Sequence, residues 1–239
     1  MMNIGQSKMR AATQAAVVLG LVAAGALLLH GAEGHGETVT LERRPLPMAE
    51  GLELDFKMSQ QRPRSDTYTA RVRLMGIDRG LKQEPSRVRY RWEIFNRERM
   101  RGQNEMGHVT TMGLHKGNSL DPWWANGQDM TTAHTHMWLS QSACQELRRK
   151  GVTQYAVDVT QRRDNDQQEL RRDSEEDFEV RIDGRTMTLR TMKLVNEHND
   201  ALWVLNDCEN PLVLKINIPG YYQWALSEAR TGKPIHKRR

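Results

Sequence analysis

The sequence lacks the short motifs that identify most common enzyme classes. It contains no Gly-x-Ser-x-Gly nucleophile motif, no phosphate-binding Walker loop and no dinucleotide-binding fingerprint. Paired acidic residues such as Glu175 and Glu176 lie in a charged stretch, without the apolar neighbours that tune a catalytic carboxylic acid. These absences favour a protein without catalytic activity, although a metal-dependent hydrolase stays open.

Long hydrophobic runs are also lacking, with one exception. Ala11 to Leu29 is an uncharged stretch of 19 residues, and Lys8 and Arg10 lie just before it. Basic residues followed by an apolar run predict export or insertion into a membrane. The run falls between the hydrophobic region of a signal peptide and the roughly 20 residues that span a bilayer.

We therefore expect residues 1–36 to be a signal peptide or an N-terminal membrane anchor. Ala32 and Gly34 have the spacing of an imperfect cleavage site, which favours cleavage over a permanent anchor. The basic residues before the run would direct the rest of the chain outward, to the periplasm or to the outer side of the inner membrane as a tethered domain. Residues 37–230 are expected to form a single β-rich domain, and 231–239 a basic disordered tail.

Cysteine is scarce, since Cys144 and Cys208 are the two in the chain. There is no Cys-x-x-Cys pair, and no His-Glu-x-x-His motif accompanies them. An even number of cysteines in an exported chain favours a disulfide, and two separate buried thiols are the alternative. A bridge across these 64 positions would contribute about 4 kcal/mol in the loop-entropy picture.

Alternation of apolar and polar residues dominates the rest of the chain. Arg87 to Phe95 is the clearest example, with arginines at every second position on one side. Such alternation indicates an antiparallel sheet with one solvated face. Asp183-Gly184 predicts a two-residue hairpin turn between Phe178–Ile182 and Met187–Val195. About ten such strands with regular turn signals predict a mainly β fold, an antiparallel β-sandwich or β-barrel.

Other stretches interrupt this pattern. Arg97 to Asp129 is polar and contains five glycines, so we expect a long loop. Gln161 to Asp177 holds seven acidic residues and predicts a solvated loop or a frayed helix. One short helix is expected over 142–150, with Ser142 as its N-cap and Gly151 as its stop.

Positive charge is concentrated in one region. The net charge of +5 is mild, so nucleic acid binding is not indicated. Between Arg62 and Arg101, however, 12 basic residues stand against 5 acidic ones. This excess is typical of a basic patch for an anionic partner, such as a lipid headgroup or a polysaccharide, or of an ordinary solvated strand face, and we favour the second interpretation.

Candidate metal ligands are concentrated between Met106 and Met137. Half of the eight histidines fall in these 32 positions: His108, His115, His134 and His136. Imidazole suits copper and zinc. On a strand over Met130 to Leu139, His134 and His136 would share a face, and His108 or His115 would be a third ligand. Because no spacing matches a recognised metal motif, a chance distribution of histidines is favoured over a site.

Paired tryptophans lie in the same polar loop. Trp123 and Trp124 follow Pro122 directly. Exposed tryptophans stack on sugar rings or anchor a protein at a membrane or protein interface, which makes the pair a candidate ligand-binding site. The favoured alternative is that they fold back over the sheet.

Together these patterns predict an exported cell-envelope β-domain that binds a partner or ligand without catalysis. The expected partner is an envelope protein, a glycan or a lipid, and residues 11–29 would contact the membrane if they are not cleaved. One alternative is an envelope copper- or zinc-binding protein that uses His134 and His136 with a loop histidine. Another is a β-barrel carrier of a hydrophobic ligand. No cofactor other than copper or zinc is expected.

Overall fold

The computed structural model describes residues 46–60, 66–80, 85–95, 105–121, 128–129, 134–157 and 167–232. All of them belong to one compact unit, Thr40–Arg239. The apolar run at 11–29, Trp123 and Trp124, and the residues after 232 lie outside the described part.

In the described part of the chain, no helix has both the length and the apolar character needed to cross a membrane.

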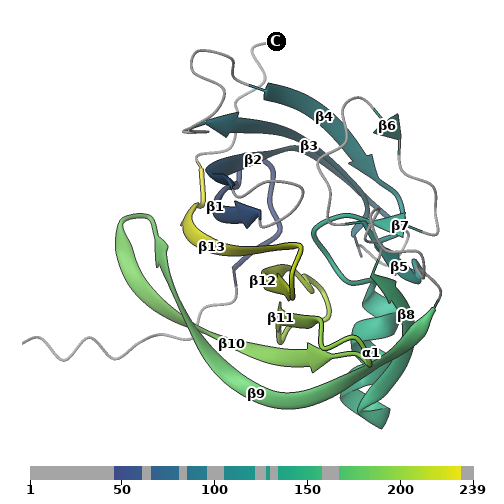
Figure 1. Ribbon diagram of the computed structural model, residues 1–239. Coiled ribbons are helices and arrows are strands. Elements are labelled where there is room, and N and C mark those ends of the chain that lie inside the picture. The colour runs from purple at the N-terminus through teal and green to yellow at the C-terminus, as the bar shows by residue number, and fades with distance from the viewer. Residues whose placement is uncertain are drawn as a thin grey trace, which may run out of the picture. The chain divides into compact units, whose positions relative to one another are not determined.

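The first half of the fold is a row of antiparallel strands joined in sequence order (Figure 1). Its members are β1 (Glu53–Gln60), β2 (Asp66–Arg79), β3 (Pro85–Phe95) and β4 (Glu105–Thr111), and the short β6 (Gln128–Asp129) pairs in parallel with β4 at the end of the row. Strand β1 pairs on its other side with the last described strand, β13 (Tyr222–Arg230). The chain thus returns at its end to the strand with which the described fold begins.

The second half is a series of hairpins that closes on itself. Strands β9 (Gln168–Ile182), β10 (Arg185–Val195), β11 (Ala201–Leu205), β12 (Val213–Ile218) and β13 pair antiparallel in this order. The end of β9 then pairs in parallel with β13, through Arg181 with Glu228 and Ile182 with Ala229. These pairings form a closed ring, as in a barrel, where strand edges are satisfied. The prediction of a mainly β fold of the sandwich or barrel type is confirmed.

Short strands extend the sheet beyond β9. Strand β8 (Val152–Val157) pairs with the start of β9, and β5 (Ser119–Leu120) and β7 (His134–Thr135) follow it.

A single apolar cluster fills the fold between these strands. On β3, Val88, Tyr90 and Trp92 point inward and are at most 4% exposed, while the intervening arginines face solvent. Trp224 of β13 packs edge-on against Phe56 of β1, with ring centroids 4.9 Å apart. Burial of such a side chain stabilises a fold by about 1.5–3 kcal/mol, so the period-two pattern of apolar residues fixes which face of each strand is inside.

The two stretches predicted to be irregular contain strands. Residues 105–111 of the expected loop form β4, and Gln168–Asp177 of the expected charged loop belongs to β9. Cross-strand partners explain the second case, because Arg190 Nε donates to Glu175 at 2.7 Å and Lys193 contacts Asp173 at 2.8 Å. Opposite charges on neighbouring strands stabilise pairing that the composition of β9 alone does not favour.

Helix α1 (Gln141–Lys150) confirms the expected helix, but the predicted N-cap residue is wrong. Ser140, not Ser142, caps it, because the Ser140 hydroxyl oxygen accepts the Ala143 N–H at 3.3 Å. Gly151 ends the helix as expected, with φ of 78° and its N–H donated to Leu147 O. The Asp183-Gly184 turn is also confirmed, since both residues have positive φ.

Candidate functional site

The segment His134–Ser140 is buried from Thr135 onward, and several of its polar side chains are hydrogen-bonded to other parts of the fold. Thr135 donates its hydroxyl to Ser119 O at 2.9 Å and lies 2.8 Å from the Tyr155 hydroxyl. Burial raises the pKa of Tyr155 to about 12, so this phenol stays neutral. The strand predicted over Met130 to Leu139 is wrong for the residues after Thr135, which bend away from regular pairing.

His136 takes part in this buried network. Its side chain is 1% exposed, and its Nδ1 is hydrogen-bonded to the Tyr90 hydroxyl of β3. Burial raises the pKa of Tyr90 well above the usual value, and the negative charge of Asp121 raises it further. A neutral phenol can donate to an imidazole nitrogen, so His136 links the segment to β3.

The other candidate metal ligands lie in different surroundings. His134 is half-buried, whereas His115 is exposed with Nδ1 3.4 Å from Gln141 Oε1. His108 lies on β4 opposite Arg91, and its side chain is outside the described part. Among the described residues, no three His, Cys, Asp or Glu side chains come close enough together to hold a metal ion. A copper or zinc site that uses His108 therefore stays a prediction.

Cys144 and Cys208 form a disulfide, as predicted from their even number. Cys144 lies on the buried face of α1, and Cys208 lies in the turn between β11 and β12. Asn210 of the same turn accepts the Trp138 indole N–H at 2.9 Å and donates to Leu46 O at 2.6 Å. The disulfide therefore fastens a turn that holds the His134–Ser140 segment in place.

The basic residues of β2 and β3 form a second candidate site, which we call the arginine face: Arg73, Arg87, Arg89 and Arg91. Arg73 and Arg91 are directly opposite each other in the pairing of the two strands. Three of these arginines make long ion pairs: Arg73 lies 3.5 Å from Glu53, and Arg87 and Arg89 lie 3.8 and 3.9 Å from Asp78, which they share. Like charges directly opposite each other destabilise a sheet, so this arrangement needs an explanation.

Arg89 is brought toward β2 by a glycine. A Cβ built on Gly76 would lie 2.5 Å from the Arg89 Nη2 atom. The guanidinium of Arg89 thus occupies the space that any other residue at position 76 would fill. From there its Nη2 atom lies 3.9 Å from the Asp78 carboxylate.

A hollow of about 200 Å³ opens beside Arg73 and Arg91. Glu53, Arg71, Arg73, Arg91, Trp92 and Glu93 line it. Arg71 is already bound, because its Nε and Nη2 atoms donate to the Asp55 carboxylate at 2.7 and 2.9 Å. The hollow therefore combines guanidinium donors with two carboxylate acceptors, a mixture that suits a ligand carrying both an anion and hydroxyl groups.

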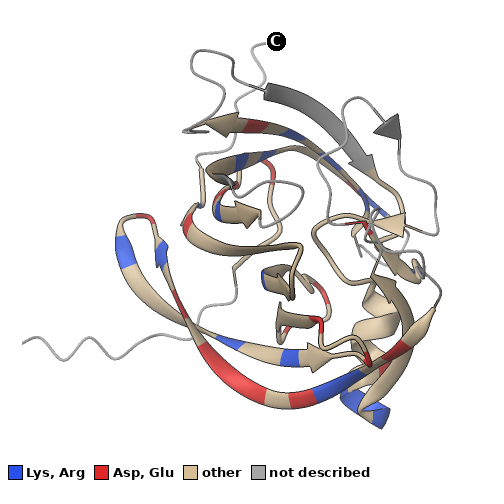
Figure 2. Cartoon of the chain, in the orientation of Figure 1, with Lys and Arg blue, Asp and Glu red and all other residues tan. Residues whose placement is uncertain are grey.

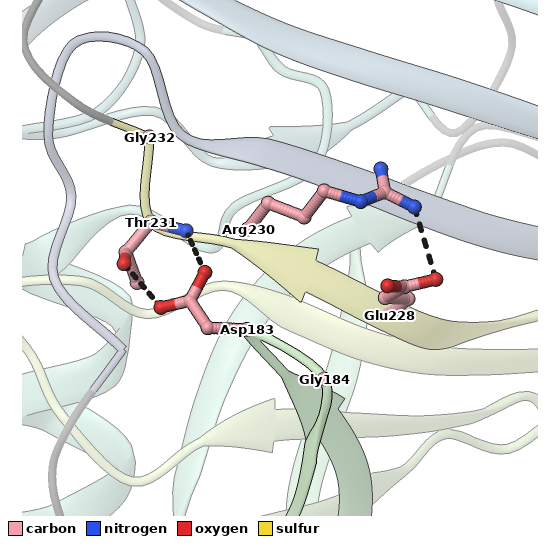
Figure 3. A pocket seen from close by; sticks show the side chains of 6 residues that line it. All are labelled: Asp183, Gly184, Glu228, Arg230, Thr231 and Gly232. Atoms are coloured by element: carbon pink, nitrogen blue, oxygen red, sulfur yellow. Dashed lines mark hydrogen bonds and ion pairs between the residues drawn. The ribbon is translucent and has the colours of Figure 1, made fainter.

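A further hollow lies at the tip of the β9–β10 hairpin (Figure 3). The Asp183 carboxylate there accepts the Thr231 N–H at 2.9 Å and the Thr231 hydroxyl, and Arg230 contacts Glu228 at 2.9 Å. Figure 3 shows these groups turned toward one another. They fasten the end of β13 to the hairpin, which explains them as structural contacts.

Sequence reasoning found the arginines but not their grouping. The alternation in β3 predicts that its arginines face solvent, and their excess over acids is visible in the sequence. The register that places Arg73 against Arg91, and the hollow beside them, depend on how β2 bulges between Leu74 and Gly76. Gly76 is the signal for that bulge, because a glycine inside a strand often marks one. Trp123 and Trp124, the predicted ligand-binding pair, lie outside the described residues.

No protein-family model matches the chain, and no curated protein or solved structure is significantly similar to it. Function is therefore inferred from the residues and their geometry.

Proposed function

We propose that this protein is an exported cell-envelope β-domain that binds a ligand or partner on its sheet surface and does not catalyse a reaction. The observation that carries the proposal is the arginine face, where like charges are held side by side next to a hollow on an exposed strand face. Binding sites often retain arrangements that cost stability, because a ligand repays the cost.

The disulfide between Cys144 and Cys208 supports export. Disulfides form and persist in oxidising compartments and are rare in the cytosol. The apolar run from Ala11 to Leu29, preceded by basic residues, supplies the signal that would direct the chain there.

The state of the buried polar groups supports binding over catalysis. His136, Tyr90 and Tyr155 are three of the described buried groups with the chemistry of an acid or base, and each is hydrogen-bonded to a neighbouring protein group. Those hydrogen bonds hold the His134–Ser140 segment in place. A general base must instead be within reach of a substrate, so these groups are better suited to a structural role.

Export is tested by fusing residues 1–45 to alkaline phosphatase, which folds actively only where its disulfides form. We expect activity with the natural run, and loss of activity when Leu19→Arg and Leu21→Arg place charges within it. Active fusions with both arginines present would contradict the assignment of the run. Turnover on a panel of esters, glycosides and phosphate esters by the full-length protein would contradict the non-catalytic role.

A further inference from the structure

We propose that the disulfide between Cys144 and Cys208 is a site of reversible thiol–disulfide exchange, and that a partner protein with a reactive dithiol reaches it at Cys208. Arg148 is the positioning residue that keeps the two cysteines together while the bond is open. This inference goes beyond the proposed ligand binding, because it uses neither the arginine face nor the hollow beside it.

The two cysteines differ in how closely another molecule can approach them. Cys144 lies on the buried face of α1 and is 0% exposed. Cys208 is half-buried in the turn between β11 and β12, next to the exposed Glu209. A thiolate must reach a disulfide sulfur to attack it, so access decides which of the two sulfur atoms reacts. Attack is therefore expected at the Cys208 Sγ atom.

The exchange balances with the partner's dithiol as the reductant. The thiolate of the partner's first cysteine attacks Cys208 Sγ, and the S–S bond breaks with its electron pair on Cys144 Sγ, which takes up a proton. The partner's second thiolate then attacks the sulfur of its own first cysteine, and Cys208 leaves as a thiolate that is protonated in turn. Two electrons and two protons pass to the protein, and the partner's dithiol becomes a disulfide. The reverse sequence closes the bond.

Arg148 joins the helix to the turn without any contribution from the sulfur atoms. Its Nε and Nη2 atoms donate to Asn206 Oδ1 at 2.9 and 2.8 Å, and Nη2 also donates to Asn206 O at 2.5 Å. Arg148 lies one helical turn after Cys144, and Asn206 lies two residues before Cys208. These hydrogen bonds therefore link the same two elements that the disulfide links.

The turn also keeps its own shape. Asp207 Oδ1 accepts the Glu209 N–H at 3.0 Å, and the Asn210 N–H donates to Asp207 O at 3.1 Å. Neither contact involves a sulfur atom. When the disulfide opens, the two cysteines therefore stay close together. Closure is then an intramolecular step with a high effective concentration, which is what reversible exchange requires.

Arg149 provides a matched control for Arg148. Both belong to the basic last turn of α1, where Figure 2 shows positive charge. Arg149 is exposed, and its charge acts on Glu146 of the same helix. Replacement of either arginine by Gln removes one positive charge from the same helix end, but only Arg148→Gln removes the contact with Asn206.

The first test asks which sulfur reacts. The single variants Cys144→Ser and Cys208→Ser are made in the full-length protein and mixed with glutathione disulfide. We expect the thiol of Cys208 to form a mixed disulfide at least about tenfold faster than the thiol of Cys144, because the second is buried. An equal or faster reaction at Cys144 would overturn the assignment of Cys208 as the point of attack.

The second test asks whether exchange occurs in the folded protein. The oxidised full-length protein is reduced by dithiothreitol at several concentrations of urea below the unfolding transition. We expect the rate of reduction to depend only weakly on urea, since the turn is reached without unfolding. A urea dependence as steep as that of global unfolding would mean that the bond opens only in the unfolded chain, and would leave a purely structural disulfide.

The third test isolates Arg148. The equilibrium between the open and closed disulfide is measured in mixtures of reduced and oxidised glutathione. Arg148→Gln should lower the equilibrium constant for closure at least about fivefold, Arg149→Gln should leave it unchanged, and Arg148→Lys, which keeps the charge but loses the fork of donors, should fall between them. Equal losses in the two Gln variants would show a general effect of charge and overturn the role of Arg148.

Two controls keep these results separate from folding and from export. Circular dichroism and the thermal midpoint of each reduced variant show whether it is folded, and Asn206→Ala, which removes the side-chain acceptor on the turn, should also lower the equilibrium constant. An unchanged constant in Asn206→Ala would contradict the positioning contact. Failure of the export fusion would contradict the proposed location and leave these measurements on the purified protein unaffected.

Discussion

The outer faces of β3 and β9 both carry a charged residue at nearly every second position, but their charges are held differently. On β9, Glu175 accepts from Arg190 at 2.7 Å and Asp173 contacts Lys193 at 2.8 Å. On β3, the closest described carboxylates lie 3.8 and 3.9 Å from Arg87 and Arg89. The charges on β9 are thus paired across strands at short distances, whereas Arg87 and Arg89 on the arginine face make longer ion pairs with Asp78.

The disulfide separates the two faces and gives the largest expected effect. The segment between Cys144 and Cys208, which are 64 positions apart, contains β8, β9, β10 and β11, but none of β1–β4. The double variant Cys144→Ser, Cys208→Ser should lower the free energy of unfolding by about 4 kcal/mol, because the denatured chain regains the entropy of an open loop. Denaturant unfolding measures this loss.

Hydrogen exchange in the same variant sharpens the comparison. We expect faster exchange in α1 and in β9–β11 than in β1–β3, since the turn at Cys208 no longer holds the hairpins. Uniform acceleration across both regions would mean that the disulfide stabilises the fold only as a whole.

Asp55 gives the next largest effect, because it is the buried carboxylate below the arginine face. Its side chain is 8% exposed and accepts from Arg71 and from Arg230, the latter at 2.8 Å. Replacement by Asn should lower the free energy of unfolding by about 2 kcal/mol, since two guanidinium groups lose a charged partner. Asp78→Asn, at a half-exposed residue with long ion pairs, should cost less than about 0.5 kcal/mol.

The pH dependence of stability follows from the same carboxylate. Burial raises the pKa of Asp55, but hydrogen bonds and attraction from Arg71 and Arg230 outweigh it, and the pKa lies below its usual value. The folded state therefore favours the ionised form. Its contribution is present at neutral pH and is lost as the pH falls below about 4. In Asp55→Asn, the unfolding free energy should depend less steeply on pH in that range.

Glu176, the residue after Glu175 on β9, gives a smaller effect. It accepts the Trp203 indole N–H at 2.7 Å, and this hydrogen bond lowers its pKa. Glu176→Ala should cost about 1 kcal/mol and change the fluorescence of Trp203. Glu179→Ala, at an exposed position of the same strand, should do neither. A silent Glu176→Ala would mean that the hydrogen bond from Trp203 does not stabilise the fold.

The sequence predicts most of the fold for a physical reason. Residues such as Val88, Tyr90 and Trp92 alternate so regularly that burial can place them on one face only. The helix near Cys144 and the Asp183-Gly184 turn are also local features with local signals. The start of strand β9 is not evident from the sequence, because its charged residues are stabilised by Arg190 and Lys193 on another strand.

The candidate site is less predictable, because it depends on register. That Arg73 meets Arg91, and that Gly76 admits Arg89, follow from a bulge in β2. Gly76 is a signal for a bulge, but it does not specify which residues then pair. For His136, by contrast, the sequence suggests a grouping that the structure does not show. Its spacing from His134 suggests a shared strand face, but a buried tyrosine on a distant strand takes its ring nitrogen.

The most direct test of the account compares the two charged faces in one spectrum. Arginine side-chain Nε–H resonances are recorded by NMR while inorganic phosphate is added, as an anionic probe, to the full-length protein. We predict that the resonances of Arg73 and Arg91 shift together and saturate, while those of Arg190 and Arg148 stay in place. Shifts of equal size on both faces, or none at Arg73 and Arg91, would contradict the assignment of the arginine face as the binding surface.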